Sequence, residues 1–281
     1  MGSYSGSSDW DLVPSTASFT AFKPRPAAAR PAPAAPATAA APAATGEDDP
    51  VAERPGPRPR LDAVIAFDTT GSMTPYLENV QQKMEYLAAG LLKLLDVEIA
   101  LIAVGDHGDG RNMLQVKTFS SDLEELKGSI QELEATDGRD QPEAFECLFK
   151  VLNGLDYEAP TVLVLITDSI PHGMEGFAGE DEGCPFGVDW REELGELKTR
   201  LKNVYLVSCS SDEAVVALQR QLVGANAFVR LGDFRRLTNL IMALLMDEVG
   251  ELDYFMGLLE RQRGRQRRDE VMRLLGHEVR P

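Results

Sequence analysis

Residues 61–72 read Leu-Asp-Ala-Val-Ile-Ala-Phe-Asp-Thr-Thr-Gly-Ser, and this stretch decides the fold. Its first seven residues are mostly apolar, which predicts a buried strand over 61–67. Asp68, Thr70 and Ser72 follow directly, so one carboxylate and two hydroxyls stand on the loop that leaves the strand. Oxygen ligands of this kind suit Mg²⁺ or Mn²⁺. The stretch therefore predicts a metal site at the end of a buried strand.

A second apolar run has the same ending. Residues 161–167 read Thr-Val-Leu-Val-Leu-Ile-Thr, and Asp168 comes next. Open α/β folds bind their ligands at the edge where parallel strands have their carboxyl ends. We therefore expect Asp68 and Asp168 to belong to a single site at that edge.

The rest of this region alternates between strand-like and helix-like patterns. Further strands are predicted over 97–104, 113–119, 203–209 and 226–231. Helices are predicted over 74–94, 121–133, 142–152, 190–201 and 211–222, with one long final helix over 237–259. The second helix is expected to open with a capping box in the string Ser121-Asp122-Leu123-Glu124. Alternation of this kind predicts a mostly parallel sheet that helices cover on both faces.

One pair of strands breaks the parallel pattern. Residues 105–112 are too few to cross over the sheet, so strands 97–104 and 113–119 are expected to form an antiparallel hairpin. We expect an α/β fold with a doubly wound, mostly parallel six-stranded sheet, one antiparallel edge strand and helices on both faces.

Composition divides the chain into four segments. Residues 1–23 form a tail whose aromatic side chains are either incidental or a short docking motif. Residues 24–60 are rich in Pro and Ala, which predicts a disordered, extended linker. Residues 61–260 hold the predicted domain. Residues 261–281 form a basic C-terminal arm, which either extends a helix or docks on the domain, or else contacts an acidic partner or nucleic acid, although no aromatic residue is interleaved to stack bases.

The charge of the chain argues against some classes of partner. It has 28 Lys and Arg residues against 45 Asp and Glu residues, a net charge of −17. A protein this acidic has no electrostatic attraction to nucleic acid. The sequence shows neither a secretory leader pattern nor an apolar stretch long enough for a bilayer, so we expect no membrane association and a cytoplasmic location.

The three cysteines, Cys147, Cys184 and Cys209, are sparse and odd in number. Such a set argues against a disulfide framework and for a reducing compartment. Their spacing fits no zinc pattern. Cys147 and Cys209 fall in or at the end of apolar segments, so both are expected to be small core residues.

In its order of motifs, the region resembles the von Willebrand factor A (vWA) family with its metal-ion-dependent adhesion site. Asp68, Thr70 and Ser72 match the Asp-x-Ser/Thr-x-Ser motif of that family, and Asp168 matches its aspartate after the fourth strand. Residues 104–109 and 167–173 are similar to the intracellular branch, which includes A domains attached to alpha-kinases. The resemblance implies the same fold and a bound Mg²⁺ or Mn²⁺.

The remaining metal ligand implied by the resemblance lies on the loop over 135–144. This loop is similar to the form Gly-Gly-Gly-Asp-x-Pro-Glu-Ala, which makes Asp140 the better match and Thr136 the fallback. The loop departs from that form, because Asp137 and Arg139 replace two of the three glycines.

A structural interpretation of the same residues is also open. Thr70 and Ser72 could be turn and N-cap residues, and Asp168 could cap the end of its strand. Three acids held close together without a cation would cost several kcal/mol, which favours the metal. For Asp106, His107 and Asp109, zinc ligation or a catalytic base is less favoured than support of the metal ligands. His172 is expected to fix its loop by a hydrogen bond.

The resemblance implies a binding module whose metal accepts an Asp or Glu from a partner protein, with no enzymatic activity. It also implies an intracellular adaptor, in bacteria often beside AAA+ ATPases, and the Ala/Pro-rich linker suits a bacterial genome. We expect a monomer. The insertion over 174–189 would shape partner choice or cover the metal.

Two other classes of function are alternatives to a binding module. In a haloacid-dehalogenase-like phosphatase, Asp68 would be the nucleophile, but Thr70 stands where the general acid is needed. Too few residues also separate Asp68 from Asp106 for that fold. The other class is a structural scaffold that has lost its dependence on metal, which the departures at Asp137 and Arg139 would explain.

Overall fold

The computed structural model describes residues 51–136, 142–175 and 183–277. For residue 72 and residues 74–81 it describes the backbone alone. The tail over 1–23, the linker up to residue 50 and the predicted ligand Asp140 therefore lie outside the described residues.

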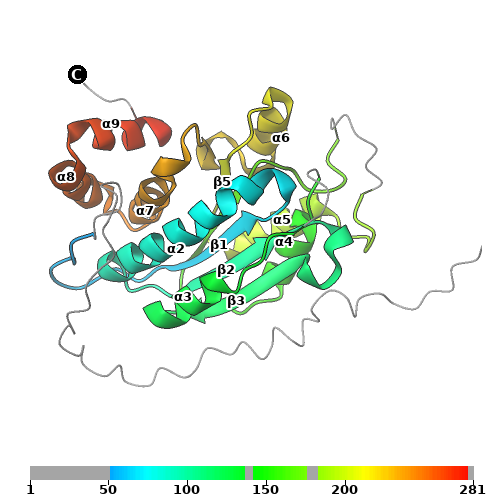
Figure 1. The fold of residues 1–281 in the computed structure, drawn as a ribbon, viewed down its shortest axis with the longest axis horizontal. Coiled ribbons are helices and arrows are strands. Elements are labelled where there is room, and N and C mark those ends of the chain that lie inside the picture. The colour runs from blue at the N-terminus through cyan, green and yellow to red at the C-terminus, as the bar shows by residue number, and fades with distance from the viewer. Residues whose placement is uncertain (1–50, 137–141, 176–182, 278–281) are drawn as a thin grey trace, which may run out of the picture.

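The strands form one six-stranded sheet in the order β3-β2-β1-β4-β5-β6 (Figure 1). The strands are β1 (Asp62–Asp68), β2 (Ile99–Val104), β3 (Leu114–Ser120), β4 (Thr161–Thr167), β5 (Asn203–Ser208) and β6 (Phe228–Arg230). All neighbours pair in parallel except β2 and β3, which form the antiparallel hairpin at one edge. The predicted fold class is confirmed.

Helices cover both faces of the sheet, because alternate residues of each buried strand point to opposite sides. Leu61, Ala63, Ile65 and Phe67 pack with α2 (Thr74–Leu94), α3 (Leu123–Gln131), α7 (Leu237–Glu248) and α8 (Leu252–Arg263). Val64 and Ala66 pack on the other face with α4 (Phe145–Asn153), α5 (Trp190–Arg200) and α6 (Glu213–Val223). Among the described residues, no helix is long and apolar enough to cross a membrane.

Two predicted helix starts are wrong. The N-cap of α3 is Asp122 instead of Ser121, and its carboxylate accepts hydrogen bonds from the backbone of Glu124 (2.8 Å) and Glu125 (3.0 Å). Helix α4 begins at Phe145 instead of residue 142, because the Glu143 amide donates to the carbonyl of Ile170 (2.9 Å). Residues before Phe145 are thus held by a neighbouring loop.

The single long helix predicted over 237–259 is in fact two helices. Gly250, at a φ of 74°, ends α7, and its amide donates to the Asp247 carbonyl (2.9 Å). The Glu251 amide donates to the Met246 carbonyl (2.8 Å), as in a glycine-terminated helix. The apolar periodicity continues across the break because both helices pack on the same core.

Both ends of the predicted domain extend beyond the expected boundaries. Arg54, within the predicted linker, forms an ion pair with Glu251 (2.8 Å). Part of the basic arm forms α9 (Arg265–Leu274), which lies beside α7 and α8 and buries Val271 completely. Of the two interpretations of the arm, the structure shows the helix docked on the domain.

The site-bearing edge follows from the strand order. The chain runs from β1 to β2 on one side and places β4 on the other side of β1. The carboxyl ends of β1 and β4 therefore adjoin where the direction of winding reverses, which is where this class of sheet binds ligands. Asp68 ends β1, and Asp168 directly follows β4.

Candidate functional site

Asp68 is the centre of the first cluster of polar residues at this edge. Its side chain is buried, and one carboxylate oxygen accepts hydrogen bonds from the Thr70 amide (2.9 Å) and the Thr70 hydroxyl (2.6 Å). The other oxygen accepts the Thr167 hydroxyl (2.9 Å). Burial, together with the charge of Asp168, raises the pKa of Asp68 to about 7 although these donors lower it. The hydrogen bonds therefore fix the orientation of the Asp68 carboxylate, while burial and the nearby Asp168 disfavour its negative charge.

Glu143 is the member of this cluster that sequence reasoning missed. It is fully buried, and among the described residues neither of its carboxylate oxygens has a hydrogen-bond partner of normal geometry. Burial and the charges of Asp68, Asp106 and Asp109 raise its pKa to about 11, against a smaller opposing influence of the Thr70 hydroxyl. An orphaned buried carboxylate of this kind requires a compensating partner. The signal in the sequence is the Pro-Glu-Ala string over 142–144, which matches the family form and contains Glu143, but which by itself assigns that residue no role.

Asp168 lies close enough for its charge to act on its neighbours. Asp168 and Asp68, after burial, raise the pKa of the Cys209 thiol to about 12. The structure therefore brings together Asp68 and Asp168, as the two strand endings predicted. Cys209 packs partly buried against the hydrophobic core, as expected.

The structure describes only part of the other predicted ligands. Thr136 is buried at the same edge, with its hydroxyl oxygen 3.4 Å from that of Thr69 and its amide donating to the Thr69 carbonyl (3.0 Å). Ser72 lies in the short 3-10 helix η2 (Gly71–Met73), but its side chain is outside the described part of the structure. Asp140 is outside it altogether. The choice between Asp140 and Thr136 stays open.

Gly105, at the end of β2, lets these loops approach one another. A Cβ at this position would lie 2.4 Å from a carboxylate oxygen of Asp109 and 2.8 Å from the Thr136 hydroxyl. The Ala144 amide also donates to the Gly105 carbonyl (3.1 Å), which ties the start of α4 to β2. A side chain at residue 105 would therefore displace the Asp109 carboxylate and the Thr136 side chain from their positions.

These residues fit a divalent metal ion. The set consists of hard oxygen atoms, the type that Mg²⁺ and Mn²⁺ prefer. The Glu143 side chain without a normal hydrogen bond among the described residues and the raised pKa of Asp68 both mark carboxyl groups whose ionised form lacks a compensating charge, which a dication would supply. Asp68, Thr70 and Asp168 could hold such an ion.

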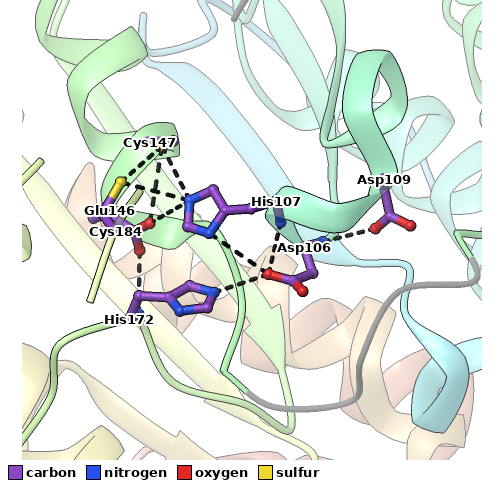
Figure 2. A network of polar contacts seen from close by, with 7 residues as sticks. All are labelled: Asp106, His107, Asp109, Glu146, Cys147, His172 and Cys184. Atoms are coloured by element: carbon purple, nitrogen blue, oxygen red, sulfur yellow. Dashed lines mark hydrogen bonds and ion pairs between the residues drawn. The ribbon is translucent and has the colours of Figure 1, made fainter. Parts of the chain in front are cut away.

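A second cluster lies beside the first, and Figure 2 shows its contacts. His107, in the 3-10 helix η3 (His107–Asn112), points its Nε2 atom toward three side chains. Glu146 Oε1 lies 2.8 Å from this nitrogen, Cys184 Sγ 3.5 Å and Cys147 Sγ 3.6 Å. The two sulfur atoms are 3.7 Å apart. The spacing of the cysteines along the chain fits no zinc pattern, and it could not show that Cys147 and Cys184 meet in the folded structure.

The charges of this cluster are tightly coupled. Contact with the Cys147 thiol, and then with His107, lowers the pKa of Cys184 to about 3 against the effect of burial. Burial alone would lower the pKa of His107, but Cys184 and Glu146 raise it to about 9. His172 Nε2 lies 2.8 Å from Asp106 Oδ1, so His172 fixes its loop as predicted. Cys147 is buried as expected, but it is also a member of this polar group.

Comparison with solved structures identifies the fold. No family model matches the chain. The von Willebrand factor domain of the type V pili tip protein Mfa5 from Porphyromonas gingivalis superposes with a TM-score of 0.51 at 12% identity, over 69% of this chain and 97% of that one. The fold is that of a vWA domain. The pilus adhesin SpaC from Lactobacillus rhamnosus GG gives a TM-score of 0.50 at 13% identity, over 72% of this chain and 31% of SpaC.

One curated protein is similar in sequence to this vWA-fold chain. The alpha-protein kinase vwkA of Dictyostelium discoideum is 28% identical over 159 residues. The match covers 52% of this chain and 24% of the kinase, so this chain corresponds to about a quarter of that protein's length.

Proposed function

We propose that this protein is a divalent-metal-dependent protein-binding module and acts as an intracellular adaptor. The observation that carries the proposal is the buried group of acids where β1 and β4 adjoin, in which the Glu143 carboxylate has no normal hydrogen bond among the described residues. A buried charge that is left uncompensated costs several kcal/mol, so the arrangement favours a bound cation.

In this proposal, Asp68, Thr70, Ser72 and Asp168 hold Mg²⁺ or Mn²⁺, with Asp140 or Thr136 as the remaining ligand. Thr167 and Thr70 orient Asp68 through the hydrogen bonds to its two oxygens. Glu143 lies behind these ligands, and a cation there would favour its ionised form, because burial and the neighbouring acids are what raise its pKa to about 11. When bound, the ion would supply a Lewis-acid position for a carboxylate from a partner.

The proposed partner is a protein that offers an Asp or Glu. An acidic surface repels other acidic surfaces, so a carboxylate would be admitted only where the metal attracts it. Two proteins that share the fold are described as a pilus adhesin and a pili tip protein, which supports a binding role. We propose a monomer without enzymatic activity. AAA+ ATPases are the first class to screen, and sparse cysteines favour an intracellular setting.

Isothermal titration of the full chain with Mg²⁺ and with Mn²⁺ tests the metal site. Saturable binding is expected for the wild type and for Asp253→Ala, a change of an exposed acid on α8, but not for Asp68→Ala. Wild-type protein that binds neither ion, with or without a captured partner, would leave a metal-independent scaffold as the function.

A partner screen then tests the binding role. Proteins captured by the wild-type chain in Mg²⁺ should be released by a chelator and should not bind the Asp68→Ala variant. Replacement of a single Asp or Glu of the partner by Asn or Gln should abolish capture. If the protein is still captured by the Asp68→Ala variant and after replacement of its own Asp or Glu residues, the proposed carboxylate contact is contradicted.

A further inference from the structure

We propose that His107, Glu146, Cys147 and Cys184 form a second metal site, separate from the Asp68 site and built for Zn²⁺ or a similar thiophilic dication. One nitrogen, one carboxylate oxygen and two sulfur atoms from these residues all lie within 4.8 Å of one another. Two thiolates, an imidazole and a carboxylate are a donor set that zinc accepts and that Mg²⁺ does not favour.

The separations between the donor atoms agree with a tetrahedral site. Zinc bonds of about 2.0–2.3 Å place neighbouring ligand atoms roughly 3.3–3.8 Å apart in a tetrahedron. The sulfur–sulfur distance is 3.7 Å, the two sulfur–nitrogen distances are 3.5 and 3.6 Å, and Cys147 Sγ lies 3.8 Å from Glu146 Oε1. The His107 Nε2–Glu146 Oε1 distance of 2.8 Å is that of a hydrogen bond, so this pair would open by roughly half an ångström around an ion.

Three separate parts of the fold converge on this point. His107 follows the end of β2, and Glu146 and Cys147 stand in the first turn of α4. Cys184 comes from the loop before α5, on a turn closed by the Gly187 amide, which donates to the Cys184 carbonyl (2.9 Å). Gly187 has a φ of 69°, which the turn requires. Backbone amides of Phe186 and Val188 donate toward the Cys184 sulfur, as they would toward a metal-bound thiolate.

Outer contacts orient the proposed ligands. His107 uses Nε2 toward the cluster, and its Nδ1 lies 3.7 Å from Asp106 Oδ1. Asp106 is itself held by His172 Nε2 at 2.8 Å and by the His107 amide at 2.6 Å. The second oxygen of Glu146 accepts the His172 amide at 3.2 Å. In metal sites, the histidine nitrogen that does not bind the ion usually faces a carboxylate or a carbonyl group, which orients the ring.

Two other uses of these residues fit the geometry less well. A catalytic cysteine needs a histidine that faces the sulfur with one nitrogen and an orienting acid with the other. Asp106, 3.7 Å from Nδ1, could orient the ring in this way, but Cys147, Cys184 and Glu146 all face Nε2. A cysteine–histidine pair needs one sulfur at that nitrogen, whereas three donors around it are the arrangement of ligands around an ion. A disulfide would use the two sulfur atoms alone, and the 3.7 Å between them is much longer than the roughly 2.05 Å of an S–S bond.

An ion at this site would fasten the loop that carries Cys184 to β2 and α4. Glu143 and Glu146 are three residues apart, so the start of α4 takes part in both clusters. The second site would thus fix the start of α4, which lies next to the Asp68 site.

Cobalt substitution of the full chain under reducing conditions tests the proposal. Co²⁺ should produce a thiolate-to-cobalt charge-transfer band and the intense visible bands of a tetrahedral site, and Zn²⁺ should remove both. Elemental analysis should find one tightly held Zn²⁺ per chain. Cys184→Ser, on a partly exposed loop, should lose the charge-transfer intensity of one thiolate, and Cys184→Ser combined with Cys147→Ser should lose the band entirely.

The chain offers matched controls. Cys209→Ser and His277→Ala change the remaining described cysteine and histidine, and both variants should keep the band and the bound zinc. Asp68→Ala should keep them too, which separates this proposal from the magnesium site. His172→Ala should weaken zinc binding by roughly 10–100-fold without loss of the band at saturating metal. Wild-type spectra without thiolate bands, zinc that is unaffected by both cysteine changes, or a Cys147–Cys184 disulfide that persists in reductant would each overturn the proposal.

Discussion

At the scale of single residues, the protonation of Asp68 controls the first site. Its pKa is about 7 in the folded chain against an ordinary value of 3.8, with burial as the main cause. A raised pKa in the folded state means that the stability contributed by protonated Asp68 is fully present below 3.8 and is lost as the pH rises through about 7. Without a cation, Asp68 therefore opposes folding in neutral and alkaline solution.

A cation at this site must compete with that proton. We predict that the affinity for Mg²⁺ rises roughly tenfold per pH unit below about pH 7 and levels off above it. Calorimetric titration from about pH 5.5 to about pH 8.5 measures this dependence. Asp253→Asn should follow the same curve as the wild type, whereas Asp68→Asn should bind weakly at every pH. An affinity that is independent of pH below 7 would show that Asp68 is not the group displaced.

At the scale of elements, α9 joins the C-terminal arm to the domain. Its basic composition left open whether the arm docks on the domain or contacts a partner, and the structure buries Val271 completely against the core that α7 and α8 share. Arg236 also lies 3.5 Å from Glu270 of α9. The helix therefore belongs to the folded domain.

The burial of Val271 gives a measurable consequence. Val271→Ala should lower the free energy of unfolding by about 1–3 kcal/mol, because two buried methyl groups are lost and a cavity remains. Arg273→Ala, a change of an exposed residue on the same helix, should alter it by less than about 0.5 kcal/mol. Urea denaturation followed by circular dichroism measures both. Equal effects of the two changes would mean that α9 does not stabilise the domain.

At the scale of the whole molecule, the net charge destabilises the folded state. The chain carries a net charge of −17, and folding brings the acidic side chains closer together, which increases their mutual repulsion. Salt shortens the range of the repulsion from about 30 Å at 0.01 M to about 8 Å at 0.15 M. The molecule is therefore expected to be sensitive both to salt in general and to a specific dication.

These two effects can be separated by thermal unfolding. We predict that NaCl raises the melting temperature through screening, and that MgCl₂ at the same ionic strength raises it further because it binds the folded state. At about 100 times the dissociation constant, specific binding contributes about 2.7 kcal/mol. In Asp68→Ala the two salts should act equally. If they already act equally on the wild type, specific stabilisation by Mg²⁺ is disproved.

The sequence by itself determined the sheet, the helices on its two faces and the edge at which Asp68 and Asp168 meet. These follow from local periodicity and from the rule that parallel strands share a carboxyl edge, both of which are written in short stretches of chain. The same periodicity could not show the break at Gly250, because the apolar pattern is continuous across both helices. The sequence left the docking of α9 open, since its composition is basic and a small group of apolar residues, with Val271 fully buried, packs it on the core.

Only the tertiary structure decided which polar residues belong together. Glu143 is fully buried, and among the described residues its carboxylate oxygens have no hydrogen bond of normal geometry, an outcome of loop paths that no residue pattern records. Cys147 and Cys184 are 37 positions apart, and Cys147 and His107 are 40 apart, yet their donor atoms meet within 3.7 Å. Such a meeting depends on strand order and loop paths, whereas a spacing rule recognises only ligands that lie close along the chain. The sequence therefore predicted that Asp68 and Asp168 meet, whereas the meeting of His107, Cys147 and Cys184 appears only in the folded structure.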